Sequence, residues 1–98
     1  MLQGKQDVID LLVKHQDELN EFGVIRLGLF GSFARNTPNQ ESDIDLVVEF
    51  KVSYKTFDNF MNLSFFLEDL LERKVDLITI DSLSPHISHN VLQEVEYV

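Results

Sequence analysis

The sequence predicts a small α/β (α+β) domain, in which helices flank a mixed sheet of about three to four strands. Apolar residues at helical spacing alternate along the chain with short runs rich in β-branched and aromatic residues. The chain has 98 residues, which suits one domain. No repeat, linker or low-complexity segment divides it. We therefore expect a single domain spanning residues 1–98.

The first part of the chain is expected to form a helix, a strand and a short second helix. Residues 5–20 carry an apolar stripe at spacings of three and four, and Gly23 is well placed to end that helix. Residues 24–30 are rich in strand formers and short enough for a buried strand. Gly31 then breaks the strand, and Ser32 is expected to cap a short helix.

The remainder is expected to add two strands, two helices and a short final strand. Alternating residues predict a strand over 43–50, and a long apolar stripe predicts a helix over about 54–71. A third strand is expected over 75–80. A last helix is expected to begin at Ser84, because a proline follows at a tolerated first-turn position. Residues 95–98 alternate, as in a short strand.

Asp43 and Asp45 stand two residues apart in an expected strand, so their side chains share one face. Asp76 stands near the start of the next expected strand, and we expect the three carboxylates to converge at one sheet edge. Like charges held together repel unless a cation lies between them, and Mg²⁺ prefers oxygen ligands. Two Mg²⁺ ions, about 3.5–4 Å apart, can stabilise an in-line displacement.

These carboxylates therefore predict a catalytic, metal-binding site for a nucleoside triphosphate. Asp43 and Asp45 are expected to bridge both ions, and Asp76 to bind the catalytic ion and accept the proton of the attacking hydroxyl. The alternative is a set of solvated surface acids, since a lone Asp-x-Asp is a weak signal. The order of the glycine-serine turn, the paired acids and a further aspartate favours the metal site.

Gly31 and Ser32 are expected to bind the phosphates of the nucleotide. Glycine lets the backbone approach a phosphate closely, and the start of a helix offers unpaired N–H groups. The Ser32 hydroxyl is expected to bind a β- or γ-phosphate oxygen, and Arg35, one turn on, to add a charge-assisted contact. A plain surface arginine is the alternative for Arg35.

Other side chains are interpreted as structural. Glu49 shares the face of the aspartates but lies farther along the strand, and Ser42 is expected to fix the loop. His15 is expected to be packed or half exposed on the first helix. Phenylalanines of the long helix are expected to be mostly core, and any left over to form a partner-facing patch: Phe57, Phe60, Phe65 and Phe66.

The composition excludes several classes of function. The net charge is −9 with only 8 lysines and arginines, which disfavours direct binding of nucleic acid. No cysteine is present, so a disulfide framework or a thiolate metal site is excluded. No run approaches membrane-spanning length, so we expect no membrane association and a cytoplasmic location.

These motifs together resemble a known family. Gly31-Ser32, followed after residues 33–42 by Asp43-Ile44-Asp45, is similar to the signature of the DNA polymerase beta nucleotidyltransferase superfamily. The stretches GSFAR and SDIDLVVEF resemble its smallest branch, the minimal nucleotidyltransferase (MNT) domain. Val75-Asp76-Leu77 matches the place of the third family aspartate. One departure is Asn36, where the family often has another glycine or a charged residue.

The resemblance implies the minimal nucleotidyltransferase fold and a specific activity. In the family, many MNT proteins are antitoxins that transfer AMP from ATP to a tyrosine hydroxyl of a HEPN-domain RNase toxin. By resemblance, Asp43, Asp45 and Asp76 are metal ligands for two Mg²⁺ ions, and Gly31 and Ser32 hold the nucleotide. ATP would be the donor substrate and a HEPN-type toxin the protein partner in a hetero-oligomer.

Two alternatives stay open at this point. A non-catalytic antitoxin would neutralise its toxin by binding alone, which the strong negative charge and the spare aromatic residues would suit. A small-molecule nucleotidyltransferase is also within the superfamily. The chain's 98 residues can form the metal–phosphate half of a site but leave little material to enclose an acceptor, which favours a protein partner that supplies the hydroxyl.

Overall fold

The computed structural model describes residues 4–35, 43–83 and 91–98. Four strands form one mixed sheet in the order β3-β2-β1-β4. The strands are β1 (Val24–Phe30), β2 (Ile44–Phe50), β3 (Val75–Thr79) and β4 (Glu96–Tyr97). β1 runs antiparallel to β2 and β4, whereas β2 and β3 are parallel. The predicted mixed sheet is therefore confirmed.

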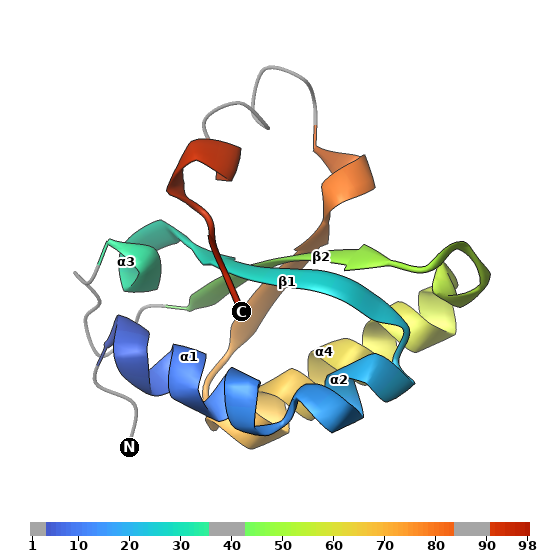
Figure 1. The fold of residues 1–98 in the computed structure, drawn as a ribbon, viewed down its shortest axis with the longest axis horizontal. Helices are drawn as coiled ribbons and strands as arrows, with labels where there is room; N and C mark the ends of the chain where they lie inside the picture. Colours follow the sequence, from blue (N-terminus) through green and yellow to red (C-terminus); the bar gives the residue numbers. More distant parts are fainter. Residues whose placement is uncertain (1–3, 36–42, 84–90) are drawn as a thin grey trace.

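Three helices cover one face of this sheet: α1 (Lys5–Lys14), α2 (Gln16–Glu21) and α4 (Phe57–Leu71) (Figure 1). A single-turn helix, α3 (Gly31–Ala34), follows β1 directly at the end of the sheet. Two 3₁₀ turns, η1 (Val52–Tyr54) and η2 (Ile80–Ser82), follow β2 and β3. Residues 91–94 are helical and lead into β4.

The core lies between the sheet and these helices. Alternate residues of β2 point into it and are 0–4% exposed: Ile44, Leu46, Val48 and Phe50. Leu63, Leu67 and Leu71 of α4 are buried against the same cluster. Every second residue of β2 and every fourth residue from Leu63 to Leu71 of α4 therefore faces the same core. Because its apolar residues face the core, β2 turns Asp45 and Glu49 to the opposite face of the sheet, where both are only partly buried.

The helix predicted over residues 5–20 is interrupted at His15, which separates α1 from α2. The His15 backbone leaves the helical region, with φ −110° and ψ 26°. Its N–H bonds the Leu12 carbonyl at 3.2 Å, while ring Nδ1 lies 2.9 Å from the Leu11 carbonyl oxygen. The imidazole therefore takes the place of the backbone donor that a continuous helix would supply, and the single-helix prediction was wrong at this residue.

Two helix starts also differ from the prediction. Ser32 does not cap α3: Phe30 is at the N-cap position without a side-chain bond, and Gly31 is already the first helical residue. The long helix begins at Phe57, because Thr56 caps it and residues 52–54 form a 3₁₀ turn. The predicted start of the last helix, at Ser84, lies outside the described residues.

Thr56 is expected to contribute measurably to stability as this N-cap. Its hydroxyl oxygen accepts a hydrogen bond from the Asn59 backbone N–H at 3.1 Å. Thr56→Ala should lower the free energy of unfolding by about 1 kcal/mol, whereas Thr56→Ser should lower it much less. Urea denaturation of the three proteins measures this difference. Equal stability of the alanine and serine variants would contradict the cap.

The phenylalanines of α4 are less buried than predicted. Phe57 is 76% exposed and Phe65 is 59% exposed, while Phe60 and Phe66 are partly buried against the core. The buried stripe consists of leucines at a spacing of four instead. Phe65 falls two residues from the nearest of them, about 200° around the helix, and so points away from the sheet. The predicted surplus of aromatic residues on this helix is therefore present at the surface.

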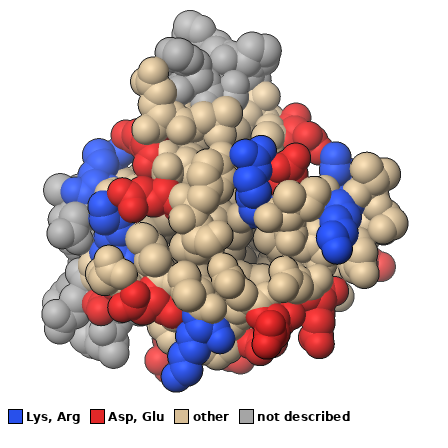
Figure 2. Space-filling view, in the orientation of Figure 1, with Lys and Arg blue, Asp and Glu red and all other residues tan. Residues whose placement is uncertain are grey.

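Basic side chains occur in small groups among acidic and uncharged ones on the face shown in Figure 2. Within the described residues, no helix combines the length and apolar character needed to cross a bilayer.

Candidate functional site

Gly31 joins β1 to α3 in a conformation that favours glycine. Its φ is +74°, in the left-handed region. A Cβ at this position would collide with the Asp45 carboxylate Oδ2 and lie 3.0 Å from Asp45 Cγ. The close approach follows from the sheet register, since Phe30 pairs with Asp45 across β1 and β2. The predicted phosphate turn and the predicted metal ligand are therefore in direct contact.

Asp45 and Asp76 are neighbours on adjacent strands. The parallel register of β2 and β3 pairs Asp45 with Asp76, one residue after Ile44 with Val75. The Ile44 N–H donates to the Lys74 carbonyl oxygen at 2.9 Å, which fixes where the pairing begins. Asp45 is partly buried and Asp76 is exposed. Long-range pairing thus places side by side two acids that are far apart in the sequence.

Asp43 stands immediately before β2 and is partly buried. Burial raises the pKa of Asp45 above its ordinary value, and the neighbouring carboxylates of Asp76 and then Asp43 raise it further. Arg35 acts in the opposite direction and lowers that pKa. The other two predicted acids and the predicted arginine therefore all act electrostatically on Asp45.

The donor chemistry of these residues fits a hard divalent cation. Carboxylate oxygens are the ligands that Mg²⁺ prefers, and a cation would relieve the repulsion that raises the Asp45 pKa. Across residues 4–35, 43–83 and 91–98, however, no three or more His, Cys, Asp or Glu side chains form a cluster that could hold a metal ion. Convergence of the three aspartates on shared cations therefore stays a prediction.

Ser32 and Arg35 flank the acids from α3. Ser32 follows Gly31 in the same turn and is partly buried. Arg35 is the C-cap residue of this helix and is exposed. Its Nη1 donates to Glu94 Oε1 at 2.9 Å. Sequence reasoning missed Glu94, because it lies 59 residues from Arg35 and no local pattern marks it.

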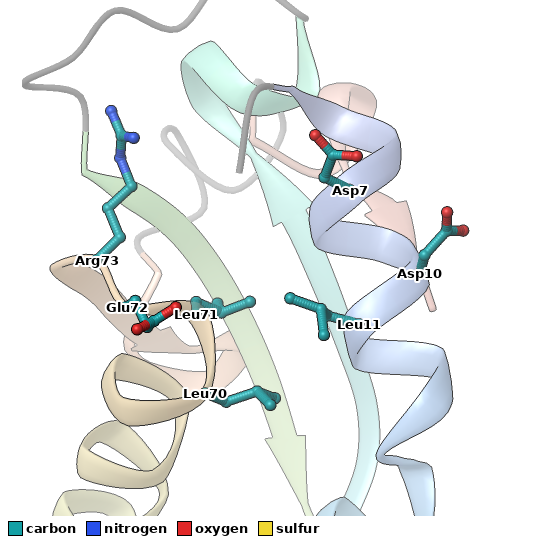
Figure 3. A pocket seen from close by; sticks show the side chains of 7 residues that line it. All are labelled: Asp7, Asp10, Leu11, Leu70, Leu71, Glu72 and Arg73. Carbon is teal, nitrogen blue, oxygen red and sulfur yellow. The ribbon is translucent and has the colours of Figure 1, made fainter. Parts of the chain in front are cut away.

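A cavity of about 550 Å³ lies elsewhere, between α1 and the end of α4 (Figure 3). Leu11 faces Leu70 and Leu71 across it, and Asp7, Asp10, Glu72 and Arg73 line its rim. None of the predicted site residues lines this cavity. The cavity lies on the face of the sheet that the helices cover, whereas Asp45 lies on the opposite face. The volume of a cavity therefore does not locate the acidic site in this protein.

The charge on Asp45 is expected to reduce stability at neutral pH. Because its folded-state pKa is raised above 3.8, the folded protein binds a proton more tightly than the unfolded chain. Its contribution to stability is therefore lost as pH rises through the folded-state pKa. Asp45→Asn should raise the urea midpoint at pH 7, and the gain should shrink as pH falls through the folded-state pKa, which lies above 3.8, because the wild-type carboxyl then becomes protonated in the folded protein. A stability difference independent of pH would contradict this.

Comparisons with known proteins agree on one family. The family described as nucleotidyltransferase domain matches residues 9–98. The protein adenylyltransferase MntA of Thermococcus cleftensis is 38% identical over 94 residues, which cover 95% of this chain and 94% of that protein.

Two solved structures are also similar. One, described as a minimal nucleotidyltransferase, has a TM-score of 0.76 and 30% identity, and the match covers 91% of this chain and 93% of that one. The other, a variant of the toxin–antitoxin complex MntA–HpeT, has a TM-score of 0.68 and 26% identity, covering 100% of this chain and 72% of that one. The similarity thus extends from the sequence to the arrangement of the elements.

Proposed function

Because the chain belongs to the nucleotidyltransferase domain family, we propose that it is an antitoxin that acts as a protein adenylyltransferase. It transfers AMP from ATP to a tyrosine hydroxyl of a cognate HEPN-type RNase toxin. The observation that carries the proposal is the contact of the Gly31 turn with Asp45, whose neighbour across the sheet is Asp76. The glycine turn expected to bind phosphate thus lies beside two carboxylates expected to bind a cation.

The nucleotide is bound at the start of α3. Gly31 has no side chain, so the turn can lie directly against the Asp45 carboxylate, and the N–H groups at the start of α3 are the donors for a phosphate. The Ser32 hydroxyl donates to a β- or γ-phosphate oxygen, and Arg35 adds charge-assisted hydrogen bonds to the triphosphate. Arg35 also offsets part of the rise in the pKa of Asp45, which favours the charged carboxylate that a cation binds.

Asp43, Asp45 and Asp76 are the residues that hold Mg²⁺ in this proposal. When bound, Mg²⁺ neutralises phosphate charge and orients the attacking and leaving oxygens. The tyrosine oxygen attacks the α-phosphorus, the bond to the β-phosphate bridging oxygen breaks, and pyrophosphate leaves. Asp76 accepts the hydroxyl proton, and its exposure on β3 leaves it accessible to an acceptor that arrives from outside.

The acceptor is a second protein. The similarity to MntA and to a toxin–antitoxin complex supports a toxin as partner. The exposed Phe57 and Phe65 give the surface apolar side chains of the kind that protein partners cover. The same two residues also suit the second candidate, in which the chain neutralises its toxin by binding alone.

A transfer assay tests the proposal. The chain is incubated with ATP labelled on the α-phosphate, Mg²⁺ and the product of the neighbouring gene, tested as the HEPN-type partner, and the product is analysed by gel and peptide mass spectrometry. We expect label on a tyrosine of the HEPN protein. Protection of cells without any label in vitro would instead support neutralisation by binding. Drug resistance conferred by this chain alone would support a small-molecule acceptor.

A further inference from the structure

Arg35, which the proposed function assigns to the triphosphate, already has an anionic partner. Its guanidinium Nη1 lies 2.9 Å from Glu94 Oε1. Both side chains are accessible, with 56% and 40% of their surfaces exposed, so the pair can open without unfolding the core. One guanidinium nitrogen that a phosphate oxygen could use is therefore already bonded to a carboxylate of the same chain.

Glu94 is held near Arg35 by the C-terminal segment, residues 91–98. β4 pairs with β1, and the Val98 N–H donates to the Leu27 carbonyl oxygen at 2.9 Å. Glu96, in the same segment, forms an ion pair of 2.9 Å with Lys5. The Arg26 guanidinium lies 5.2 Å from the centre of the Tyr97 ring. The backbone pairing with β1 is sufficient to hold the segment in place and to keep the Glu94 carboxylate near Arg35, whereas the ion pair of Glu96 is exposed.

Arg35 is a cation beside several carboxylates, so whether Glu94 or a triphosphate binds its guanidinium matters for nucleotide affinity. The carboxylates of Asp76 and Asp43 act on Asp45, and Arg35 is the cation that offsets them there. A triphosphate and Glu94 are both anionic, and both accept hydrogen bonds from guanidinium N–H groups. They therefore compete for Arg35, and they repel each other when both are close to it.

We infer that Glu94 restrains ATP binding by pairing with Arg35, so that the triphosphate must displace its carboxylate from the guanidinium. The inference rests on the proposed function, because it assigns Arg35 to the nucleotide. It makes Glu94 an autoinhibitory residue that acts on nucleotide affinity. Neutralising this side chain while keeping its size is then expected to strengthen binding.

Isothermal titration with AMP-PNP and Mg²⁺ at low salt tests this on the full chain. We expect Glu94→Gln to tighten binding about three- to fivefold, a range set by the strength of an exposed ion pair. Glu96→Gln is the matched control, because it removes the same charge from the same segment but from the pair with Lys5. It should leave the affinity unchanged. In an Arg35→Gln background, Glu94→Gln should produce no gain.

Three results would overturn the inference. Weaker or unchanged binding by Glu94→Gln would mean that Glu94 positions Arg35 or has no effect on it. An equal gain from Glu96→Gln would reveal a general effect of net charge. If Glu94→Gln still tightened AMP-PNP binding in the Arg35→Gln background, the Arg35–Glu94 ion pair could not be the cause. If the wild type bound no AMP-PNP, the proposed function would fail together with the inference, whereas normal binding with an unresponsive Glu94 would reject the inference alone.

Discussion

Replacing Asp43 and Asp45 together by asparagine is expected to abolish AMP transfer while the fold is retained. Asparagine has nearly the same shape as aspartate but carries no charge, so it binds a divalent cation far more weakly. Loss of several kcal/mol of charge stabilisation in the transition state corresponds to a decrease in rate of at least about 10²-fold. The labelled-ATP assay with the HEPN partner measures this decrease.

Stability should change in the opposite direction. Burial and the adjacent carboxylates raise the pKa of Asp45, so removal of its charge relieves a cost in the folded state. A double variant that is inactive yet at least as stable as the wild type in urea would indicate a site that exchanges stability for function. An inactive variant that is also unfolded would not support the assignment, and circular dichroism distinguishes the two cases.

Glu49→Gln is the matched control for this experiment. Glu49 is also on β2, faces the same side of the sheet as Asp45, and is paired with Arg26 at 2.8 Å. This substitution removes one negative charge from the same strand but outside the proposed site. Near-normal transfer is expected, since an exposed ion pair contributes at most about 1 kcal/mol to stability. If transfer by the double aspartate variant matched that of Glu49→Gln, the two aspartates would have no catalytic role.

Gly31→Ala is expected to have the second-largest effect, on both stability and nucleotide binding. The left-handed backbone costs a residue with a Cβ about 1–2 kcal/mol. The new methyl group would also collide with the Asp45 carboxylate, so that carboxylate must move. Because displacement of a reacting group by about 1 Å can lower a rate by about 10²-fold, transfer should fall steeply. Urea denaturation and titration with AMP-PNP measure the two effects separately.

Gly23→Ala separates backbone strain from the site. Gly23 has φ +75°, nearly the same as the +74° of Gly31, but precedes β1 while Gly31 follows it. Its added methyl group would meet the Tyr54 ring instead of a carboxylate. We expect a similar loss of stability with AMP-PNP affinity preserved. Unchanged affinity in Gly31→Ala, or equal loss in both variants, would show that the close approach to Asp45 does not matter for the nucleotide.

The local sequence pattern was sufficient to predict most of the helices and strands. The strand predicted over 24–30 is β1 without correction, and the strand predicted over 43–50 begins one residue later, at Ile44. The first was predicted from a short run of strand formers, and the second from the period of two that a buried sheet imposes on neighbouring residues. The break at His15 could not be predicted in the same way, because it depends on one ring nitrogen that bonds a carbonyl of the preceding turn.

The residue types of the candidate site, and their order, were likewise determined by the sequence alone. Alternation along one strand is enough to turn Asp45 away from the apolar side of the sheet. Tertiary structure decided which distant residues meet it: Asp76 by the parallel register of β2 and β3, and Gly31 by the antiparallel register of β1 and β2. It also decided that Glu94 reaches Arg35. Periodicity reports only what neighbours along the chain do, whereas register and the path of the C-terminal segment result from packing of the whole core.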